Sequence, residues 1–146
     1  MTATAADNTA WDSELSRALR DRGQRVTSQR LLIHRAFREL DHHASAEEVL
    51  AAVSPRLPNV SLPTVYATLD LFRELGIARR VSAGRGAILY DPRSEAHHHV
   101  VCRRCGKVED LEARIDLSPA MSAAGRRGYA AEGAELVLSG LCSDCR

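Results

Sequence analysis

The apolar positions in the first half of the chain recur at the spacing of amphipathic helices. They predict a short helix over residues 12–22, a second helix capped by Thr27 or Ser28, a third that begins at Ser45 and a fourth that begins at Ser61. The last three starts offer a hydroxyl that can accept from the first backbone N–H groups of a helix. The first half is therefore expected to be helical.

Capping residues and apolar stripes support the predictions of these helices. Ser45 and Glu48 form an S-x-x-E capping box, and Gly23 and Gly76 are expected to end the first and fourth helices. The predicted buried stripes consist of Leu31, Leu32, Ala36, Phe37 and Leu40 in the second helix and of Val65, Leu69, Phe72 and Leu75 in the fourth.

Strand patterns follow the helices. Residues 77–81 and 87–91 flank a glycine-rich turn at 82–86 and predict a β-hairpin. A β-hairpin that follows such helices is typical of a winged helix-turn-helix domain. Further along, we expect strands over 97–102, 107–111 and 135–141 and a weaker helix over 117–127.

These elements predict an α+β fold with two domains. We expect a disordered tail over residues 1–10, a winged-helix domain over 11–88 and a small α/β domain over 89–146. The second domain is too small to form a hydrophobic core that would let it fold without a metal ion or a partner.

Composition narrows the class of protein. The 146 residues are 45% hydrophobic and 27% charged, as in soluble globular proteins, and the net charge of +1 argues against a uniformly basic surface. No apolar run approaches the length of a membrane span, and the first ten residues do not form a secretory signal. We expect a cytoplasmic protein with no membrane partner.

Basic residues gather locally before the second helix. A solvated helical face is the simpler interpretation of arginines alone, but beside a winged helix a phosphate-binding cluster is favoured. The cluster consists of Arg17, Arg20, Arg22, Arg25 and Arg30.

All four cysteines form two C-x-x-C pairs, Cys102 with Cys105 and Cys142 with Cys145. Four thiolates make the closed tetrahedral set of a structural Zn²⁺ site, which would tie together the ends of the second domain. A thioredoxin-like redox pair lacks the preceding βαβ pattern, and reversible disulfides that release zinc are the other alternative. Gly106 allows a left-handed residue after the first pair.

Three consecutive histidines precede the first cysteine. On a strand, His97 and His99 share one face while His98 points the other way. Asp91 and Asp110 can supply carboxylates to the same place if the fold brings them together, and the alternative is that the histidines are exposed polar strand residues. His34 is interpreted as a surface or hydrogen-bonded helix residue without a role.

Taken together, these stretches resemble the ferric uptake regulator family of metal-dependent repressors over roughly residues 12–146. The matching motifs are R-V-T-S-Q-R at 25–30, H-H-A-S-A-E-E-V at 42–49, S-L-P-T-V-Y-A-T-L at 61–69, L-F-R-E-L-G at 71–76, H-H-H-V-V-C-R-R-C-G-K-V-E-D at 97–110 and L-C-S-D-C at 141–145.

The resemblance implies a homodimer that binds a double-stranded, AT-rich inverted-repeat operator and is not an enzyme. It implies a dimerisation role for the second domain, structural zinc on the four cysteines, and regulatory Fe²⁺ or Mn²⁺ on His43, Asp91, His97, His99 and Asp110. On DNA it implies a fourth helix in the major groove, with contacts from Arg25, Ser61, Thr64 and Tyr66.

Aspartate at positions 91 and 110 resembles the peroxide-sensing branch of the family, whereas the iron-uptake branch carries glutamate there. The alternatives are a manganese, iron, zinc or nickel uptake repressor without peroxide sensing, a metal-dependent enzyme, and a zinc-stapled interaction module without a DNA role. Tyr66 could also be a core aromatic, although it lies off the buried stripe, and Ala67 stands where relatives often carry a polar or basic residue.

Overall fold

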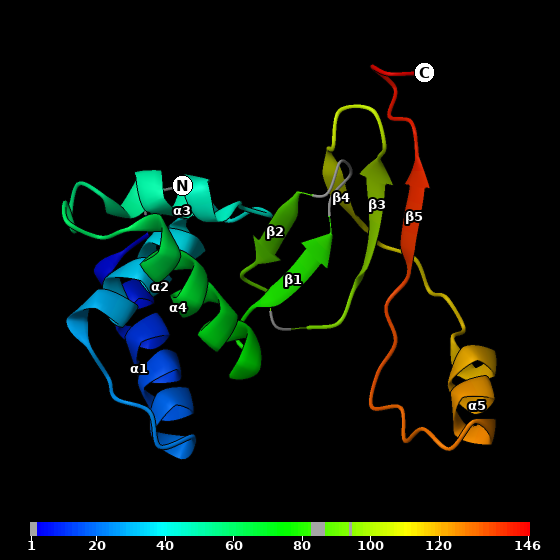
Figure 1. The fold of residues 1–146 in the computed structure, drawn as a ribbon, viewed down its shortest axis with the longest axis horizontal. Helices are drawn as coiled ribbons and strands as arrows, with labels where there is room; N and C mark the ends of the chain where they lie inside the picture. The colour runs from blue at the N-terminus through cyan, green and yellow to red at the C-terminus, as the bar shows by residue number, and fades with distance from the viewer. Residues whose placement is uncertain (1–2, 83–86, 94) are drawn as a thin grey trace. The chain divides into compact units, whose positions relative to one another are not determined.

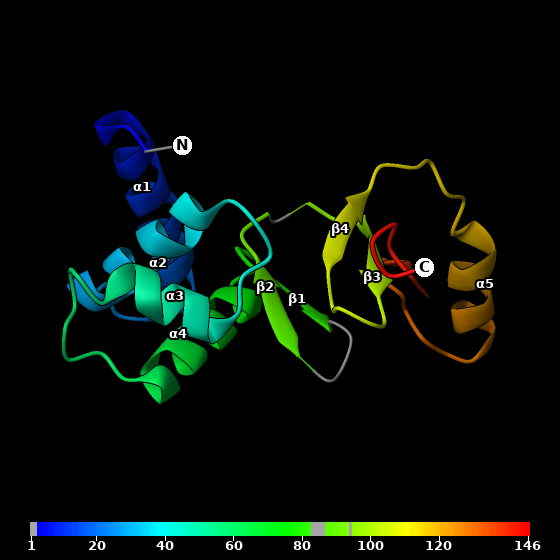
Figure 2. The ribbon, with the colours of Figure 1, turned by 90° about the horizontal axis from the view of Figure 1, so that it is seen from above.

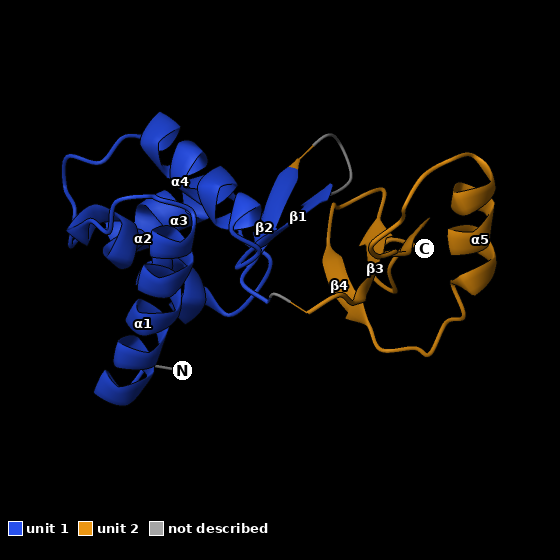
Figure 3. Cartoon of the chain, turned by 90° about the horizontal axis from the view of Figure 1, so that it is seen from below, with its two compact units in different colours: residues 1–82, 88–94 blue, residues 83–87, 95–146 orange. Residues whose placement is uncertain are grey.

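The computed structural model describes residues 3–82, 87–93 and 95–146. The chain divides into two compact units, shown in Figure 3: unit 1 comprises residues 1–82 and 88–94, and unit 2 comprises residues 83–87 and 95–146. Unit 1 extends beyond the expected limit at residue 88 because the second hairpin strand pairs with the first. The α+β class predicted from the sequence is confirmed.

Unit 1 contains four helices, α1 (Ala5–Asp21), α2 (Ser28–Leu40), α3 (Ala46–Val53) and α4 (Leu62–Glu74), drawn from blue to green in Figure 1. The predicted caps are confirmed. The side chains of Thr27, Ser45 and Ser61 each accept from a backbone N–H of the first helical turn, and Ser45 forms the capping box with Glu48.

The first helix begins earlier than the sequence pattern predicts. The disordered tail expected over residues 1–10 is wrong from Ala5 onward, because Thr4 and Asp7 form a capping box. The Thr4 hydroxyl accepts from Asp7 N–H at 3.2 Å, and the Asp7 carboxylate accepts from Thr4 N–H at 2.9 Å. The helix is held in unit 1 by Leu15 and Leu19, which are fully buried.

The wing is a two-stranded antiparallel sheet of β1 (Arg79–Ser82) and β2 (Ile88–Asp91). The predicted hairpin is thus confirmed, while the glycines of its expected turn lie outside the described residues. An isolated antiparallel bridge joins Ala44 to Tyr90, with backbone N–H to carbonyl distances of 2.9 and 2.8 Å. This bridge fixes the segment before α3 against β2.

Unit 2 is a three-stranded sheet with one helix. Its elements are β3 (His98–Cys102), β4 (Val108–Leu111), α5 (Ser118–Arg126) and β5 (Val137–Gly140). The strand order is β4-β3-β5, in which β4 is antiparallel and β5 parallel to β3. No residue of α5 is buried, and Figures 1 and 2 both show this helix standing off the sheet. Unit 2 therefore has little apolar core of its own.

None of the described helices combines the length and the apolar character that a membrane span requires.

The core of unit 1 includes one histidine. The face of α2 that is fully buried consists of Ile33, His34, Ala36 and Phe37, whereas Leu31, Leu32 and Leu40 of the predicted stripe are only half-buried. The interpretation of His34 as a surface or hydrogen-bonded residue is wrong. Its ring is fully buried edge-on against Phe72, and neither ring nitrogen has a hydrogen-bond partner among the described residues.

Burial, together with the nearby Arg38 guanidinium, lowers the pKa of His34 to about 4. The unfolded chain therefore binds a proton at this histidine more readily than the folded chain does. Stability is then lost as the pH falls from about 6.5, the ordinary histidine pKa, toward the folded value.

We expect His34→Leu to remove this acid sensitivity. Between about pH 7.5 and about pH 5, the wild-type free energy of unfolding should fall by about 2 kcal/mol more than that of the variant. Urea unfolding at both pH values measures the difference, with the exposed His42→Leu as the control. Equal pH dependence in wild type and His34→Leu would contradict the assignment of a buried neutral imidazole.

Candidate functional site

The two C-x-x-C pairs meet at one end of the unit 2 sheet. Cys102 ends β3, and the parallel register pairs it with Gly140 at the end of β5, two residues before Cys142. The turn after Cys102 closes with a Gly106 N–H to Cys102 carbonyl hydrogen bond at 2.9 Å, and Gly106 has the predicted left-handed conformation with φ of 79°. The equivalent hydrogen bond of the second pair runs from Arg146 N–H to the Cys142 carbonyl at 3.1 Å.

The four sulfur atoms fit a tetrahedral zinc ion. They all lie within 4.8 Å of one another, and the Cys105 and Cys142 Sγ atoms are 3.8 Å apart. A tetrahedron with Zn–S bonds of about 2.3 Å has sulfur atoms about 3.8 Å apart. The donor set and its spacing therefore suit a closed structural site.

The electrostatics of the cluster also favour a cation. Backbone N–H groups of Cys105 and Cys142 donate to the Cys102 sulfur and lower the pKa of this thiol to about 5. The hydrogen bond with the Cys142 thiol, together with burial, raises the pKa of Cys145 to about 12. The crowded sulfurs cannot all become thiolates unless a positive ion compensates their charge.

Unit 2 holds a second group of ligand atoms at the opposite end of β3. The antiparallel register places His99 directly across from Asp110 of β4, and His97 lies two residues earlier on the same face. The Nε2 atoms of the two imidazoles are 3.0 Å apart. The Asp110 Oδ1 atom is 3.2 Å from His97 Nε2 and 3.7 Å from His99 Nε2. Two imidazole nitrogens and a carboxylate oxygen thus converge.

Hydrogen bonds at the far nitrogen of each ring set the direction of the lone pairs. The His97 Nδ1–H donates to the Glu95 carbonyl at 2.7 Å, and the His99 Nδ1–H donates to the Glu135 carboxylate at 2.8 Å. Because both acceptors demand a proton on Nδ1, both neutral rings present the lone pair of Nε2 to the point where they meet. Two lone pairs and a carboxylate directed at one point are a donor set that could hold a divalent cation.

His98 points to the opposite face of β3, as the alternation of a strand predicts. Its Nδ1 accepts from the Leu136 N–H at 3.1 Å, so this imidazole pairs with the segment that leads into β5. His98 is therefore a structural residue of the sheet and is not one of the converging ligands.

Unit 1 holds a smaller group of ligand atoms, His43 and Asp91. The backbone bridge between Ala44 and Tyr90 places these two residues across from each other, because antiparallel neighbours on either side of a pair also face one another. Their side chains meet with His43 Nε2 at 3.1 Å from Asp91 Oδ2, and both are largely buried. Arg93 N–H donates to the other Asp91 oxygen at 2.9 Å and fixes the carboxylate.

The residues predicted to contact DNA near the start of α4 are only partly engaged in contacts within unit 1. The exposed Ser61 hydroxyl caps the helix by accepting from Thr64 N–H at 3.3 Å and lies 2.9 Å from the Thr64 hydroxyl. The Tyr66 hydroxyl donates to the Glu47 carboxylate at 3.2 Å, and its half-buried ring packs against the core. Thr64 also lines a hollow of about 380 Å³ between α4 and the start of α2, which includes Arg30.

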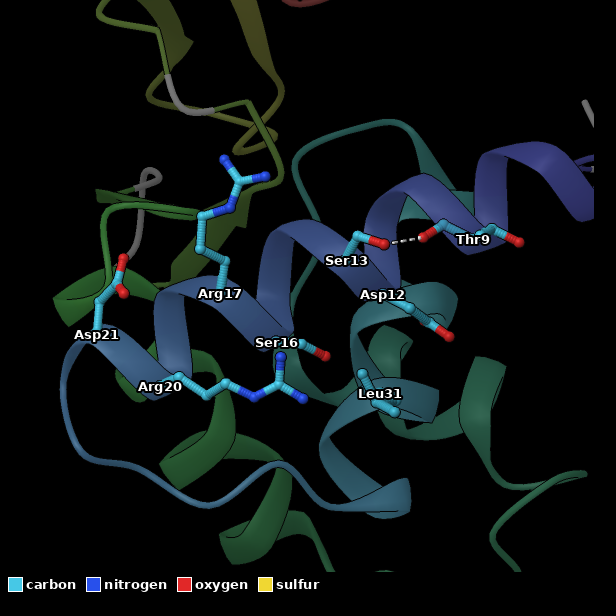
Figure 4. Close-up of a pocket in the computed structure, with 8 residues that line it drawn as sticks. All are labelled: Thr9, Asp12, Ser13, Ser16, Arg17, Arg20, Asp21 and Leu31. Carbon is cyan, nitrogen blue, oxygen red and sulfur yellow. Dashed lines mark hydrogen bonds between the residues drawn. The ribbon is translucent and has the colours of Figure 1, made fainter.

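The five clustered arginines lie on α1, on the segment after it and at the start of α2. Arg25 is exposed, and its carbonyl accepts from the Arg30 guanidinium at 2.6 Å. Arg17 and Arg20 line a hollow of about 620 Å³ along α1, and Figure 4 shows their guanidinium groups pointing in different directions from the helix. Asp12 and Asp21 line the same hollow, so its charge is mixed.

Glu135 is the site residue that sequence reasoning missed. It precedes β5 and lies 36 residues after His99, and no local motif connects the two. The sequence signal that could have indicated it is an acidic residue at the start of a strand expected to belong to the same small sheet.

We expect Cys142→Ser to abolish zinc binding at the four-cysteine cluster, where the ion would tie the ends of unit 2 together. Because a structural zinc site contributes on the order of 10 kcal/mol, its loss should unfold unit 2. Elemental analysis should show zinc falling from one ion per chain to almost none, and limited proteolysis should cut within residues 95–146. Ser143→Ala, in the same turn, is the control. Full zinc content in Cys142→Ser would contradict the four-thiolate site.

Known proteins share both the sequence pattern and the fold. Residues 21–139 match the family described as the Ferric uptake regulator family. The transcriptional regulator FurA of Mycobacterium tuberculosis is 33% identical over 128 residues, which cover 87% of this chain and 86% of FurA. The peroxide-responsive repressor PerR of Staphylococcus epidermidis is 35% identical over 94 residues, which cover 64% of this chain and 63% of that relative.

Among solved structures, the ferric uptake regulator of Pseudomonas aeruginosa with manganese aligns with a TM-score of 0.70 and 29% identity, covering 91% of this chain and 98% of that one. The family match, the FurA relative and this fold agree. The His/Asp ligand groups, Cys102 and Cys105 lie within the matched residues, and Cys142 and Cys145 follow shortly after them. The chain belongs to the ferric uptake regulator family, whose members are metal-responsive, dimeric, DNA-binding transcription regulators and not enzymes.

Proposed function

We propose that this chain is an Fe²⁺- or Mn²⁺-responsive repressor that senses peroxide, and that it binds its operator when a regulatory ion is held by His43, Asp91, His97, His99 and Asp110. The observation that carries the proposal is the convergence of two imidazole lone pairs and the Asp110 carboxylate in unit 2. The His43 and Asp91 pair of unit 1 supplies further donors of the same chemistry.

The donor atoms favour the harder members of the first transition series. All five proposed ligands offer nitrogen or oxygen, and the described thiols are gathered in the other cluster. Imidazole with carboxylate suits Fe²⁺ and Mn²⁺, although Zn²⁺ and Ni²⁺ bind the same groups more tightly where they are available. The structural ion on the four cysteines is proposed to be Zn²⁺.

In this proposal the two ligand groups act together on the angle between the units. The ion would take donors from His43 and Asp91 of unit 1 and from His97, His99 and Asp110 of unit 2. It would then stabilise one arrangement of the two units over the others. Each factor of ten in its preference for that arrangement corresponds to about 1.4 kcal/mol. DNA affinity then rises with ion binding because fewer non-binding arrangements compete.

On DNA, we propose that α4 enters the major groove of an AT-rich inverted repeat and that the homodimer reads both halves. Thr64 and Tyr66 lie on this helix and Ser61 caps its start, and Arg25 with the neighbouring arginines would contact phosphates. A repressor that acts on chromosomal operators is expected in the cytoplasm.

We expect His43→Ala to abolish ion-dependent operator binding, since it removes the unit 1 imidazole. With Mn²⁺ present, the dissociation constant for an AT-rich palindromic duplex should rise by about 100-fold, equivalent to about 2.8 kcal/mol. Fluorescence anisotropy measures it with and without Mn²⁺. His42→Ala, which changes the adjacent exposed histidine, is the matched control. If both variants bind the duplex as the wild type does, the proposed site does not control DNA binding.

We expect peroxide to modify the iron-loaded protein at His43 or His97. In the net reaction one peroxide oxygen would be inserted at an imidazole C–H, the other would leave as water, and the ring would lose two electrons; bound Fe²⁺ would supply the redox chemistry that activates the peroxide. Mass spectrometry of peptides should show the addition of one oxygen atom to His43 or His97, with loss of operator binding. The manganese-loaded protein is the control and should be unmodified. Ion-dependent operator binding that is indifferent to peroxide would instead select a metal-uptake repressor.

A further inference from the structure

We propose that Glu135 is a positioning residue for the regulatory ion: its carboxylate holds His99 in the tautomer whose Nε2 lone pair faces the ligand group. This inference rests on the proposed function, because it concerns how one of the proposed ligands is oriented. Glu135 would act through His99 and would not itself contact the ion.

The contact between Glu135 and His99 carries the proposal, and it is short and largely shielded from solvent. Glu135 Oε1 lies 2.8 Å from His99 Nδ1, while His99 Nε2, on the other side of the same ring, lies 3.0 Å from His97 Nε2. The His99 side chain is 0% exposed and that of Glu135 is 24% exposed. A buried imidazole bonded to a carboxylate at one nitrogen has its proton and its ring orientation fixed.

The segment that follows Glu135 is tied to the start of β3. His99 N–H donates to the Leu136 carbonyl at 3.0 Å, and Leu136 N–H donates to His98 Nδ1 at 3.1 Å. The parallel register then pairs His99 with Val137. These three contacts fix the backbone next to Glu135 beside β3, within reach of the His99 ring for its side chain.

The two histidines of the ligand group are therefore positioned differently. The His97 Nδ1–H donates to the Glu95 carbonyl, a neutral acceptor two residues away. The His99 Nδ1–H donates to an anionic acceptor from a distant segment. A carboxylate partner makes the opposite nitrogen a stronger donor to a cation, and removal of such partners typically costs 10–100-fold in metal affinity.

The connection also makes the start of β5 part of the metal response. Residues 135–137 contact His98 and His99 through the backbone and through Glu135. Whatever stabilises this segment should therefore strengthen ion binding, and ion binding should stabilise the segment by the same free energy.

The test compares Glu135→Ala and Glu135→Gln with Glu132→Ala, a control in the same loop, all in the full-length zinc-loaded protein. Mn²⁺ is titrated and followed by electron paramagnetic resonance of the free ion. We expect Glu135→Ala to weaken Mn²⁺ binding about 10–100-fold and Glu132→Ala to leave it unchanged. Glu135→Gln should lose less than the alanine variant but more than about twofold, because its amide oxygen still accepts from Nδ1–H without a full charge.

The tautomer of His99 provides a readout that does not depend on DNA binding. Histidine ¹⁵N spectra of the zinc-loaded protein without Mn²⁺ should show His99 protonated at Nδ1 in the wild type and in Glu135→Gln, and a mixture of tautomers in Glu135→Ala. If the alanine variant fails to retain its zinc and its fold, the glutamine variant decides. Unchanged Mn²⁺ affinity in that variant overturns the proposal.

A His97→Ala arm separates this inference from the proposed function. If His97→Ala abolishes Mn²⁺ binding while Glu135→Ala leaves both the affinity and the His99 tautomer unchanged, the positioning role of Glu135 is rejected and the regulatory site stands. If Mn²⁺ binding survives His97→Ala as well, the proposed function itself fails.

Discussion

The pairing of β3 with β4 is the constraint on which the unit 2 ligand group depends. It sets His99 across from Asp110, and the alternation of the strand then brings His97 to the same face. The Nε2 atoms of the two rings meet at 3.0 Å because each Nδ1 already donates to a fixed acceptor. Lone pairs that face each other at this distance repel unless a proton or a cation lies between them. The proposed regulatory ion would meet that electrostatic requirement.

A single strand links this ligand group to the cysteine cluster. The histidines lie at the start of β3 and Cys102 lies at its end, so an ion that fixes one end of the strand limits the movement of the other. The two groups of donors suit different tasks: four sulfurs would enclose an ion and hold the sheet ends together, whereas imidazoles and carboxylates would bind a cation reversibly. Unit 2 has few buried apolar side chains, so such bonds replace a core.

Local signals in the sequence predicted much of the fold, and the failures have physical reasons. Thr27, Ser45 and Ser61 cap helices as expected because a cap involves only neighbouring residues. Thr4 and Asp7 form a capping box as well, but the small polar residues around them lack the apolar periodicity that indicates a helix. The burial of His34 depends on which face of α2 packs against the other helices. The apolar spacing predicted a helix but not which of its faces is buried. Glu135 reaches His99 only through the parallel pairing of β3 with β5, which no local pattern encodes.

The central claim is that one divalent ion takes the Nε2 atoms of His97 and His99 and the carboxylate of Asp110, with His43 and Asp91. Anomalous scattering at the manganese edge, from crystals of the zinc-loaded protein grown with Mn²⁺, tests it most directly. The account predicts one manganese peak bonded to both Nε2 atoms and to Asp110, separate from the cysteine-bound ion. A manganese peak elsewhere, or one bonded through Nδ1 of either histidine, would contradict it.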